Sequence, residues 1–565
     1  MRPEVVPLPA PAGFHTTPSP VTYEATPGTL KWVYEGATVA QATFQSDRIM
    51  RFAGTVPFSF DTDQHQLGTY FYSLPKLTES SRDTVDWASM GLMPLRLVAL
   101  KGTLSTINSA TFKNGRVTIH PDENGRWELV VAERSPSDDS IAGESSDDWL
   151  TKTQAVTLDE CCAQCDLSFV EYARAMMPWP EVSNLDLHAC YVMWTSTVRG
   201  EGFLRKEAVL MSKLWMNKVR LCRLFRTTEL TRIQVWSWDN CFNALALAAH
   251  PGLLQSALDN LMEPFNHQLS DGRIPDAIMY NEITWDFVKP PIQGWTLERL
   301  LTLRPDISNE SLSDIYAPLC RFTNMWLHTR RCIGSELPYY IHGNDSGWDN
   351  STSFMADNVI INADLASHLI LQTNILAYLS KRLGRGEEGY WVGERTRLVK
   401  ALIDELWDGE VFLVKRVADG STSKSSSLLQ LVPLIASRFL PKHIVDKMMS
   451  QVESFTTSWG LASEPPSSPY YESDGYWRGP IWAPSTILLE SGLREAGHTK
   501  LADDIRSKFF ELCAHGGFAE NFDAVTGEGH RDLSHTWTSS IYLVLRRQAR
   551  GAQQEAMDFT IVDAR

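Results

Sequence analysis

Acidic side chains beside tryptophan recur in the second part of the chain, in a pattern that suits acid–base chemistry. Asp239 follows Trp238, Asp349 follows Trp348, and Glu520 stands in a Gly-rich polar segment. Cleavage of a glycosidic bond needs one protonated carboxyl on the leaving oxygen and one carboxylate that activates water or attacks the sugar carbon. Indole rings are a common floor for sugar faces, so carboxyls in Trp-rich loops favour glycoside hydrolysis. The segments that concentrate these residue types span 235–242, 272–295, 342–354, 474–485 and 516–530.

Each segment also has a purely structural explanation. Asp239, at an expected helix start, could be an ordinary cap or first-turn charge. Asp345 and Asp349 lie four residues apart, and they could be an acid with a neighbour that tunes it or an Asx-turn followed by an N-cap. The other segments could be a structural loop, a Pro-Gly turn with aromatic packing and a flexible Gly-rich loop. The combination of all five, rather than any one, favours chemistry.

The chain lacks the motifs of several other enzyme classes. It has no His-Glu-X-X-His spacing, and the cluster of Cys161, Cys162 and Cys165 is followed by no matching pair at zinc-ligand spacing. A Gly-X-Ser-X-Gly elbow and the Gly-rich nucleotide loops are also missing. We therefore expect no metal and no cofactor.

The charge balance and the cysteine pattern indicate which partners and which cellular compartment to expect. The 52 Lys and Arg against 68 Asp and Glu give a net charge of -16, which disfavours nucleic acid and anionic membrane as partners. No apolar run is long enough to predict a membrane span, and the first residues show no signal-peptide pattern. Nine scattered cysteines do not resemble a disulfide framework, and sequons at Asn344 and Asn350 fall where a glycan would block the expected site. We expect a cytoplasmic protein; the oligomeric state is left open.

Two different patterns divide the chain. The first 135 residues or so are typical of strands in a β-sandwich, with Asn114-Gly115 and Asn124-Gly125 as expected hairpin turns. Residues 135–148 are rich in Ser, Asp and Gly, which predicts an exposed connection. We therefore place an N-terminal β-rich domain with its linker at 1–148 and a mainly helical domain at 149–565.

The second domain shows an apolar period near 3.6 residues. Phe242, Leu245, Ala246 and Ala249, for example, fall on one helix face. The chain has no fixed repeat of 20 to 50 residues, which disfavours a solenoid. Helix pairs closed into a ring, with loops converging on one end, would give the same helical pattern and form a deep pocket. The expected helices span 207–225, 239–250, 253–269, 363–383, 388–407, 426–438, 442–454, 484–497, 499–513 and 534–547.

The region from about Ala189 to Leu545 resembles glycoside hydrolase family 63, especially its compact members that are like mannosylglycerate hydrolase. The resemblance is carried, in the order of the family, by WSWDNCF, KPPIQ, SGWDNS, YWRGPIW and FAENFDAVTGEG. It implies a mainly α fold, an (α/α)6 barrel often preceded by a β-sandwich, and hydrolysis with inversion at the anomeric carbon.

The same resemblance assigns roles to individual residues. The family's catalytic acid falls on Asp349 and its base on Glu520. Residues of the matching motifs are implied to bind the sugar or to wall its subsite: Trp238, Asp239, Gln293, Trp348, Trp477, Arg478, Gly479 and Trp482.

Two departures from the family pattern lie in the acid loop. The family often has Glu before Ser-Gly and Pro after Asn-Ser, whereas this chain has Asp345 and Thr352, which indicates a different aglycone. We expect an inverting, exo-acting α-glycosidase for a small oligosaccharide or glycoside, an α-glucoside or α-mannoside. The alternatives are a sugar epimerase or lyase on the same scaffold, with His342, His515 or His535 in proton transfer, and a carbohydrate-binding protein without catalysis.

Overall fold

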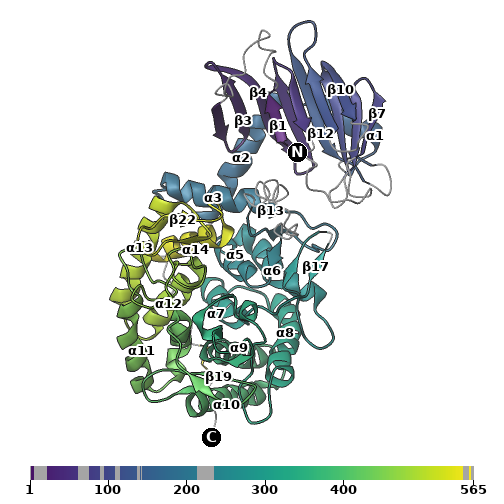
Figure 1. Cartoon of the computed structure of the whole chain (residues 1–565). Coiled ribbons are helices and arrows are strands. Elements are labelled where there is room, and N and C mark those ends of the chain that lie inside the picture. Colours follow the sequence, from purple (N-terminus) through teal and green to yellow (C-terminus); the bar gives the residue numbers. More distant parts are fainter. Residues whose placement is uncertain are drawn as a thin grey trace. The chain divides into compact units, whose positions relative to one another are not determined.

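A computed structural model describes residues 2–5, 22–61, 76–88, 94–108, 115–135, 140–141, 143–212, 234–280, 282–550 and 559–560. Contacts divide these residues into two compact units, the first ending at Ala173 and the second starting at Arg174 (Figure 1). The predicted boundary after residue 148 falls within helix α1 (Ser146–Gln154). The division into domains at residues 148 and 149 stays a prediction.

The first unit is a two-sheet β structure, in agreement with the predicted fold class. Its apolar core gathers large aromatic side chains from strands of both sheets, among them Trp32, Phe52, Phe58, Phe60 and Trp127. The smaller sheet has the order β1-β6-β11-β10, formed by β1 (Arg2–Val5), β6 (Phe58–Asp61), β11 (Gly115–His120) and β10 (Thr103–Asn108). The larger sheet has the order β2-β3-β4-β5-β12-β9-β8-β7, formed by β2 (Thr22–Thr26), β3 (Thr29–Tyr34), β4 (Ala37–Ser46), β5 (Ile49–Gly54), β12 (Trp127–Glu133), β9 (Leu95–Lys101), β8 (Thr84–Ala88) and β7 (Lys76–Ser81).

The two expected hairpin turns turn out differently. Asn124-Gly125 is a tight turn, with Gly125 at φ +70°, but it joins β11 to β12, which belong to different sheets. It was wrongly predicted as a hairpin because a local turn motif does not say which sheet the next strand joins. Strands β10 and β11 do pair as a hairpin; Asn114 lies outside the described residues, and Gly115 is the first residue of β11.

The outer face of the larger sheet is partly covered by helices of the same unit. Trp149 of α1 packs with Val98 and Val130. Helix α2 (Leu158–Met176) is tied to the sheet edge by the carboxylate of Asp166, which accepts a hydrogen bond of 2.7 Å from the Gly28 amide. The apolar side chains between α1 and this outer face therefore form a second, smaller core.

The second unit is a closed double ring of helices (Figure 1). Consecutive inner helices contact one another around the ring, and α14 closes it by packing on α5. The inner helices are α5 (Asp239–Leu247), α7 (Gln293–Leu303), α9 (Ala363–Arg382), η7 (Leu428–Phe439), α12 (Ala483–Glu495) and α14 (Thr536–Ala549). The helices that alternate with them in the chain are α3 (Asn184–Ser196), α6 (Leu254–Met262), α8 (Asn309–Asn324), α10 (Glu388–Leu406), α11 (Lys442–Phe455) and α13 (Thr499–Gly516).

Burial separates the two rings. Nearly every residue of α5 and α9 is buried, whereas α8, α10, α11 and α13 bury only one face. A helix that is buried all round belongs to the centre of a structure, and a helix with one apolar stripe belongs to its surface. The ring of helix pairs confirms the predicted (α/α)6 barrel.

Two of the expected helices need correction. Residues 208–209 of the segment expected to be helical at 207–225 form strand β14 (Ala208–Val209), which pairs with β13 (Thr197–Val198); residues 213–233 lie outside the described part. The segment expected at 426–438 is a 3-10 helix, η7, interrupted at Ala436 and containing Pro433. Proline removes a backbone donor and disfavours a continuous α-helix.

Candidate active site

The five predicted segments meet the barrel at the N-terminal ends of its inner helices. Asp239 and Gln293 are the first residues of α5 and α7. Trp482 and His535 are the N-caps of α12 and α14, and the segment 342–354 precedes α9. Because consecutive inner helices run the same way around the ring, these segments converge on one end, where the helix dipoles present partial positive charge.

Tryptophans from three of these segments and from α14 form one aromatic cluster. The rings of Trp477 and Trp482 are stacked, with centroids 4.0 Å apart, and Trp348 lies 4.5 Å from Trp477. Trp238 lies 6.4 Å from Trp477 and 5.9 Å from Trp537. All of these rings are buried, so most of their surface packs against other parts of the protein.

Asp239 is a buried carboxyl with open hydrogen-bonding capacity. Its side chain lies beside this cluster, and Oδ1 has no hydrogen-bond partner among the described residues. Burial raises its pKa to about 7; the charge of Lys289 opposes the rise, while Glu520 and Asp276 add to it. The amide oxygen of Gln293 is likewise buried and unbonded within the described ranges, while its Nε2 donates to the Ser237 carbonyl at 3.3 Å.

The loop that carries Asp349 is held in place by Asp345. The Asp345 carboxylate accepts hydrogen bonds from Arg330 Nη1 and from the amides of Val288 and Ile341, each at 2.9 Å. Asp345 is fully buried, and both of its oxygens are engaged. Its partners Val288 and Arg330 come from other segments and make Asp345 an anchor of the loop; that it also tunes Asp349 stays a prediction.

Close packing fixes the rest of this loop. Gly347 has φ +73° and lies so close to the Trp238 indole that a Cβ atom would approach ring atoms within 2.7 Å. The Asn350 amide donates to the Gly475 carbonyl at 3.0 Å and accepts from the Trp477 amide at 2.9 Å. Thr352, at the position where the family often has Pro, donates to Glu464 at 2.8 Å. The acid loop is thus tied to the segment that carries Trp477.

Glu520 is distant from Asp239 in the sequence but lies in the same electrostatic neighbourhood. It is buried, its amide donates to the Asp532 carbonyl at 2.7 Å, and its own carbonyl accepts from the Trp537 indole at 3.1 Å. Its charge contributes to the raised pKa of Asp239, whereas the charge of Asp349 contributes to the raised pKa of Asp276.

Asp276 and Lys289 are site residues that the sequence-based prediction missed. Lys289 Nζ is buried, 3.5 Å from Asp276 Oδ1 and 4.9 Å from the centroid of the Trp236 ring, and it donates to the Asn344 carbonyl at 3.1 Å. Burial opposes a charge on Lys289, but Asp276, Asp349 and Asp239 outweigh it and raise its pKa. Burial also raises the pKa of Asp276 to about 6.

The remaining predicted residues lie around this centre. Arg478 is partly exposed and pairs with Glu472 at 2.9 Å. Gly479 has φ +148°, and a Cβ atom there would clash with the Glu472 carbonyl. Tyr476, whose carbonyl accepts from the Trp482 indole at 2.9 Å, has φ +63°, a strained backbone of the kind that collects at functional sites.

The histidines of the alternative hypothesis are engaged in packing. His342 stacks on Phe287, His515 on Trp459 and His535 on Trp537. Across the described residues, no group of three or more His, Cys, Asp or Glu side chains is arranged to hold a metal ion, and no helix is both long and apolar enough to cross a membrane.

Residues 232–538 match the family model of the mannosylglycerate hydrolase MGH1-like glycoside hydrolase domain. The chain belongs to this family, within glycoside hydrolase family 63. Among its relatives is the mannosylglycerate hydrolase of Rubrobacter radiotolerans, 29% identical over 201 residues that cover 34% of this chain and 43% of the relative. The glucosylglycerate hydrolase of Mycolicibacterium hassiacum is 29% identical over 83 residues, 15% of this chain and 19% of that enzyme. The chain therefore spans less than half the length of these curated relatives.

A solved structure shares the barrel of this glycoside hydrolase family. It is the family 63 mannosylglycerate hydrolase of Thermus thermophilus in complex with glucose, with a TM-score of 0.54 and 17% identity, covering 65% of this chain and all of that one. At this identity the likeness concerns the fold.

Proposed function

We propose that the chain is an inverting, exo-acting α-glycosidase in which Asp349 is the general acid and Glu520 the general base. The observation that carries this proposal is the raised pKa of two buried carboxyls, Asp239 and Asp276, to which the charges of Glu520 and Asp349 respectively contribute. Burial and these neighbouring charges favour the protonated form of Asp239 near neutral pH. A protonated carboxyl together with an ionised one is what glycoside hydrolysis requires.

The roles follow from the family motif and the geometry of the loops. Asp349 would protonate the glycosidic oxygen, and Glu520 would take a proton from the water that attacks the anomeric carbon from the other side. The rigid anchoring of the acid loop by Asp345 and Asn350 supports this division, because a general acid has to be held within hydrogen-bond reach of the leaving oxygen. In an inverting enzyme the two carboxyls stand about 6.5–9.5 Å apart, with room for the water.

Substrate binding is assigned to the surrounding side chains. The open oxygens of Asp239 and Gln293 would accept hydrogen bonds from sugar hydroxyls, because a buried acceptor without a partner costs free energy until a ligand fills it. Trp238, Trp348, Trp477 and Trp482 would wall the subsite, with Arg478 and Gly479 at its edge. The relatives' names point to small α-mannosides or α-glucosides of glycerate as the first substrates to examine.

A single kinetic experiment tests both activity and stereochemistry. The protein is incubated with mannosylglycerate, glucosylglycerate and a panel of α-linked disaccharides, and proton NMR follows the anomeric region during the first minutes. We expect the β-anomer of the released sugar to accumulate first. Initial release of the α-anomer would contradict inversion, and no hydrolysis of any α-glycoside would contradict the proposed class of activity.

A further inference from the structure

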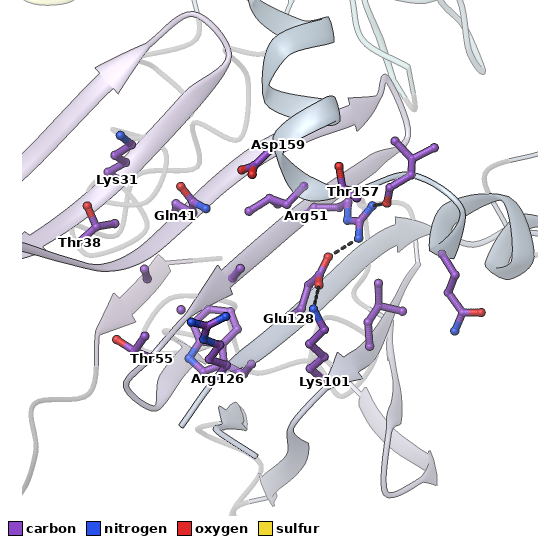
Figure 2. A pocket seen from close by; sticks show the side chains of 18 residues that line it. Lys31, Thr38, Gln41, Arg51, Thr55, Lys101, Arg126, Glu128, Thr157 and Asp159 are labelled. Atoms are coloured by element: carbon purple, nitrogen blue, oxygen red, sulfur yellow. Dashed lines mark hydrogen bonds and ion pairs between the residues drawn. The ribbon is translucent and has the colours of Figure 1, made fainter. Parts of the chain in front are cut away.

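A cavity of about 710 Å³ lies on the outer face of the larger sheet of the first unit (Figure 2). All of its lining residues belong to that unit, so it is separate from the barrel site. They come from strands β3, β4, β5, β9 and β12, and from the turn that leads from α1 into α2. A cavity of this size can hold a molecule the size of a sugar.

A single cross-strand row forms the floor of this cavity. Lys31 pairs with Gln41, Gln41 with Ala53, Ala53 with Glu128, and Glu128 with Lys101. Residues that are opposite one another in neighbouring strands point to the same face of a sheet. The small side chain at the middle of the row leaves space between the polar groups at its two ends.

The one carboxylate of this floor is already neutralised. Arg51 and Lys101 both pair with Glu128, and the Lys101 Nζ is 3.2 Å from Glu128 Oε2 (Figure 2). The Arg51 side chain is only 3% exposed and also donates to the Thr153 and Val156 carbonyls. Its Nε nevertheless has no hydrogen-bond partner among the residues that the structure describes.

Further positive charge surrounds the cavity without an ion partner in the described ranges. Lys31 and Arg126 line the cavity, and only Asp159 opposes them. Helix α2 begins at the cavity wall, where the Thr157 hydroxyl accepts from the Glu160 amide at 3.3 Å, and the N-terminal end of a helix carries partial positive charge. Free anions of low molecular weight are the ligands that such a field attracts.

We propose that this cavity binds a small hydroxylated anion, a sugar that carries a carboxylate or a phosphate. Lys31 and Arg126 would meet the anionic group, with the charge of the buried Arg51 guanidinium behind them, and Gln41 with the Thr38 and Thr55 side chains would meet the hydroxyls. Trp127, the aromatic residue among those lining the cavity, is 1% exposed and offers no face on which a neutral sugar could stack. The inference does not depend on the proposed glycosidase activity.

Calorimetric titration of the full chain tests this site. The probes are D-glucuronate, glucose 6-phosphate, inorganic phosphate and glucose. We expect saturable binding of glucuronate, glucose 6-phosphate or both. Lys31→Ala and Arg126→Ala should each weaken that binding by about tenfold or more, because each removes a hydrogen bond to a charged group. Lys152→Ala, which removes an exposed lysine of the same unit outside the cavity, is the matched control and should bind as the wild type does.

The remaining outcomes decide against the proposal. Binding that is lost in Asp239→Ala but kept in Lys31→Ala would place the anion in the barrel. No saturable binding of either acidic sugar, or binding unchanged in both cavity variants, would overturn the site. Inorganic phosphate bound as tightly as glucose 6-phosphate would overturn the role of the hydroxyl groups. Thermal unfolding of each variant shows that a loss of binding is not a loss of fold.

Discussion

Buried charged side chains are paired to different degrees at the two ends of the barrel's inner helices. Toward their C-terminal ends, Glu298 is met by Arg438 at 2.5 Å and by the Asn374 amide at 3.0 Å, and Asp186 is met by Arg546 at 2.9 Å and by Tyr542 at 2.8 Å. At the N-terminal ends, Asp276, Asp349 and Asp239 all act on the charge of Lys289, and Asp239 has an unbonded oxygen in the described part of the chain. Buried charges that are fully paired hold the ring together, whereas those left open are available for chemistry.

The largest expected effect is on turnover at the N-terminal end. Asp349→Asn and Glu520→Gln should each lower kcat by about a hundredfold or more, since a general acid or base contributes roughly 10² to 10⁴. The folded state should persist, because neither change alters the shape of the side chain. Glu528→Gln, on an exposed position of the same segment as Glu520, is the control and should remain active. Near-normal turnover of either variant would move the acid or base elsewhere.

The next effect is on stability at the C-terminal end. Arg438→Met leaves the 6% exposed Glu298 carboxylate without its cation, and breaking a buried pair costs about 3 kcal/mol or more. We expect that loss in the free energy of unfolding in urea, with kcat/KM unchanged. Lys442→Met, which breaks an exposed pair with Asp446, should cost less than about 1 kcal/mol. A fall in kcat/KM without a fall in stability would contradict the division between the two ends.

A smaller effect links Asp239 to the pH dependence of stability. Its pKa is raised to about 7, so between roughly pH 4, its unfolded value, and pH 7 the folded chain holds a proton that the unfolded chain has released. Stability therefore falls as pH rises through this window. Asp239→Asn should remove this contribution. The Tm of the variant minus the Tm of the wild type should therefore increase from pH 4 to pH 8, and the kcat/KM of the variant should be lower. For the control Asp314→Asn, at an exposed position of α8, the difference in Tm from the wild type should not change with pH. If the difference for Asp239→Asn does not change with pH either, the pKa of Asp239 is not raised.

The smallest effect concerns the position of the pH–rate profile. Lys289→Gln removes a cation that interacts with Asp349, the proposed acid, as well as with Asp276 and Asp239, so ionisation of these carboxyls should become less favourable. We expect the profile of kcat/KM to move toward higher pH by about one unit, and Lys289→Arg to keep it in place. A variant that is slower at every pH with an unmoved profile would give Lys289 a purely structural role.

The helical region and the five segments could be predicted because both leave local signals, whereas the (α/α)6 barrel was implied by the resemblance to glycoside hydrolase family 63. The Trp-Asp-Asn triplets are unusual in composition, and the helices that follow them have a clear apolar period. Asp276 leaves no such signal, because an aspartate after Ile-Pro is ordinary in an exposed turn. Lys289 belongs to the KPPIQ motif, but a lysine before Pro-Pro does not by itself indicate a buried charge. Their burial depends on carboxyls that the ring brings together from distant segments.

Asp345 is a second residue whose tertiary partners could not be predicted from the sequence. Its spacing from Asp349 predicted either a tuning neighbour or an Asx-turn, and it did not reveal that Arg330 and two backbone amides bind its carboxylate. The hydrogen-bond partners of a buried aspartate are set by tertiary contacts, and a spacing of four residues does not reveal them. The start of the segment expected to be helical at 207–225 was wrong for a related reason, since residues 208–209 form strand β14 by pairing with β13.

The Asn350 amide has an evolutionary consequence. By bonding to Gly475 and Trp477, it couples the loop next to Asp349 to the segment that carries the stacked indoles, so neither can shift without the other. Mutations that reshape the segment of stacked indoles would also displace Asp349, the proposed acid, and most would be lost to selection if that proposal holds. New substrate preferences should then arise by changes outside this coupled pair, where a loop can vary in length or sequence without moving Asp349.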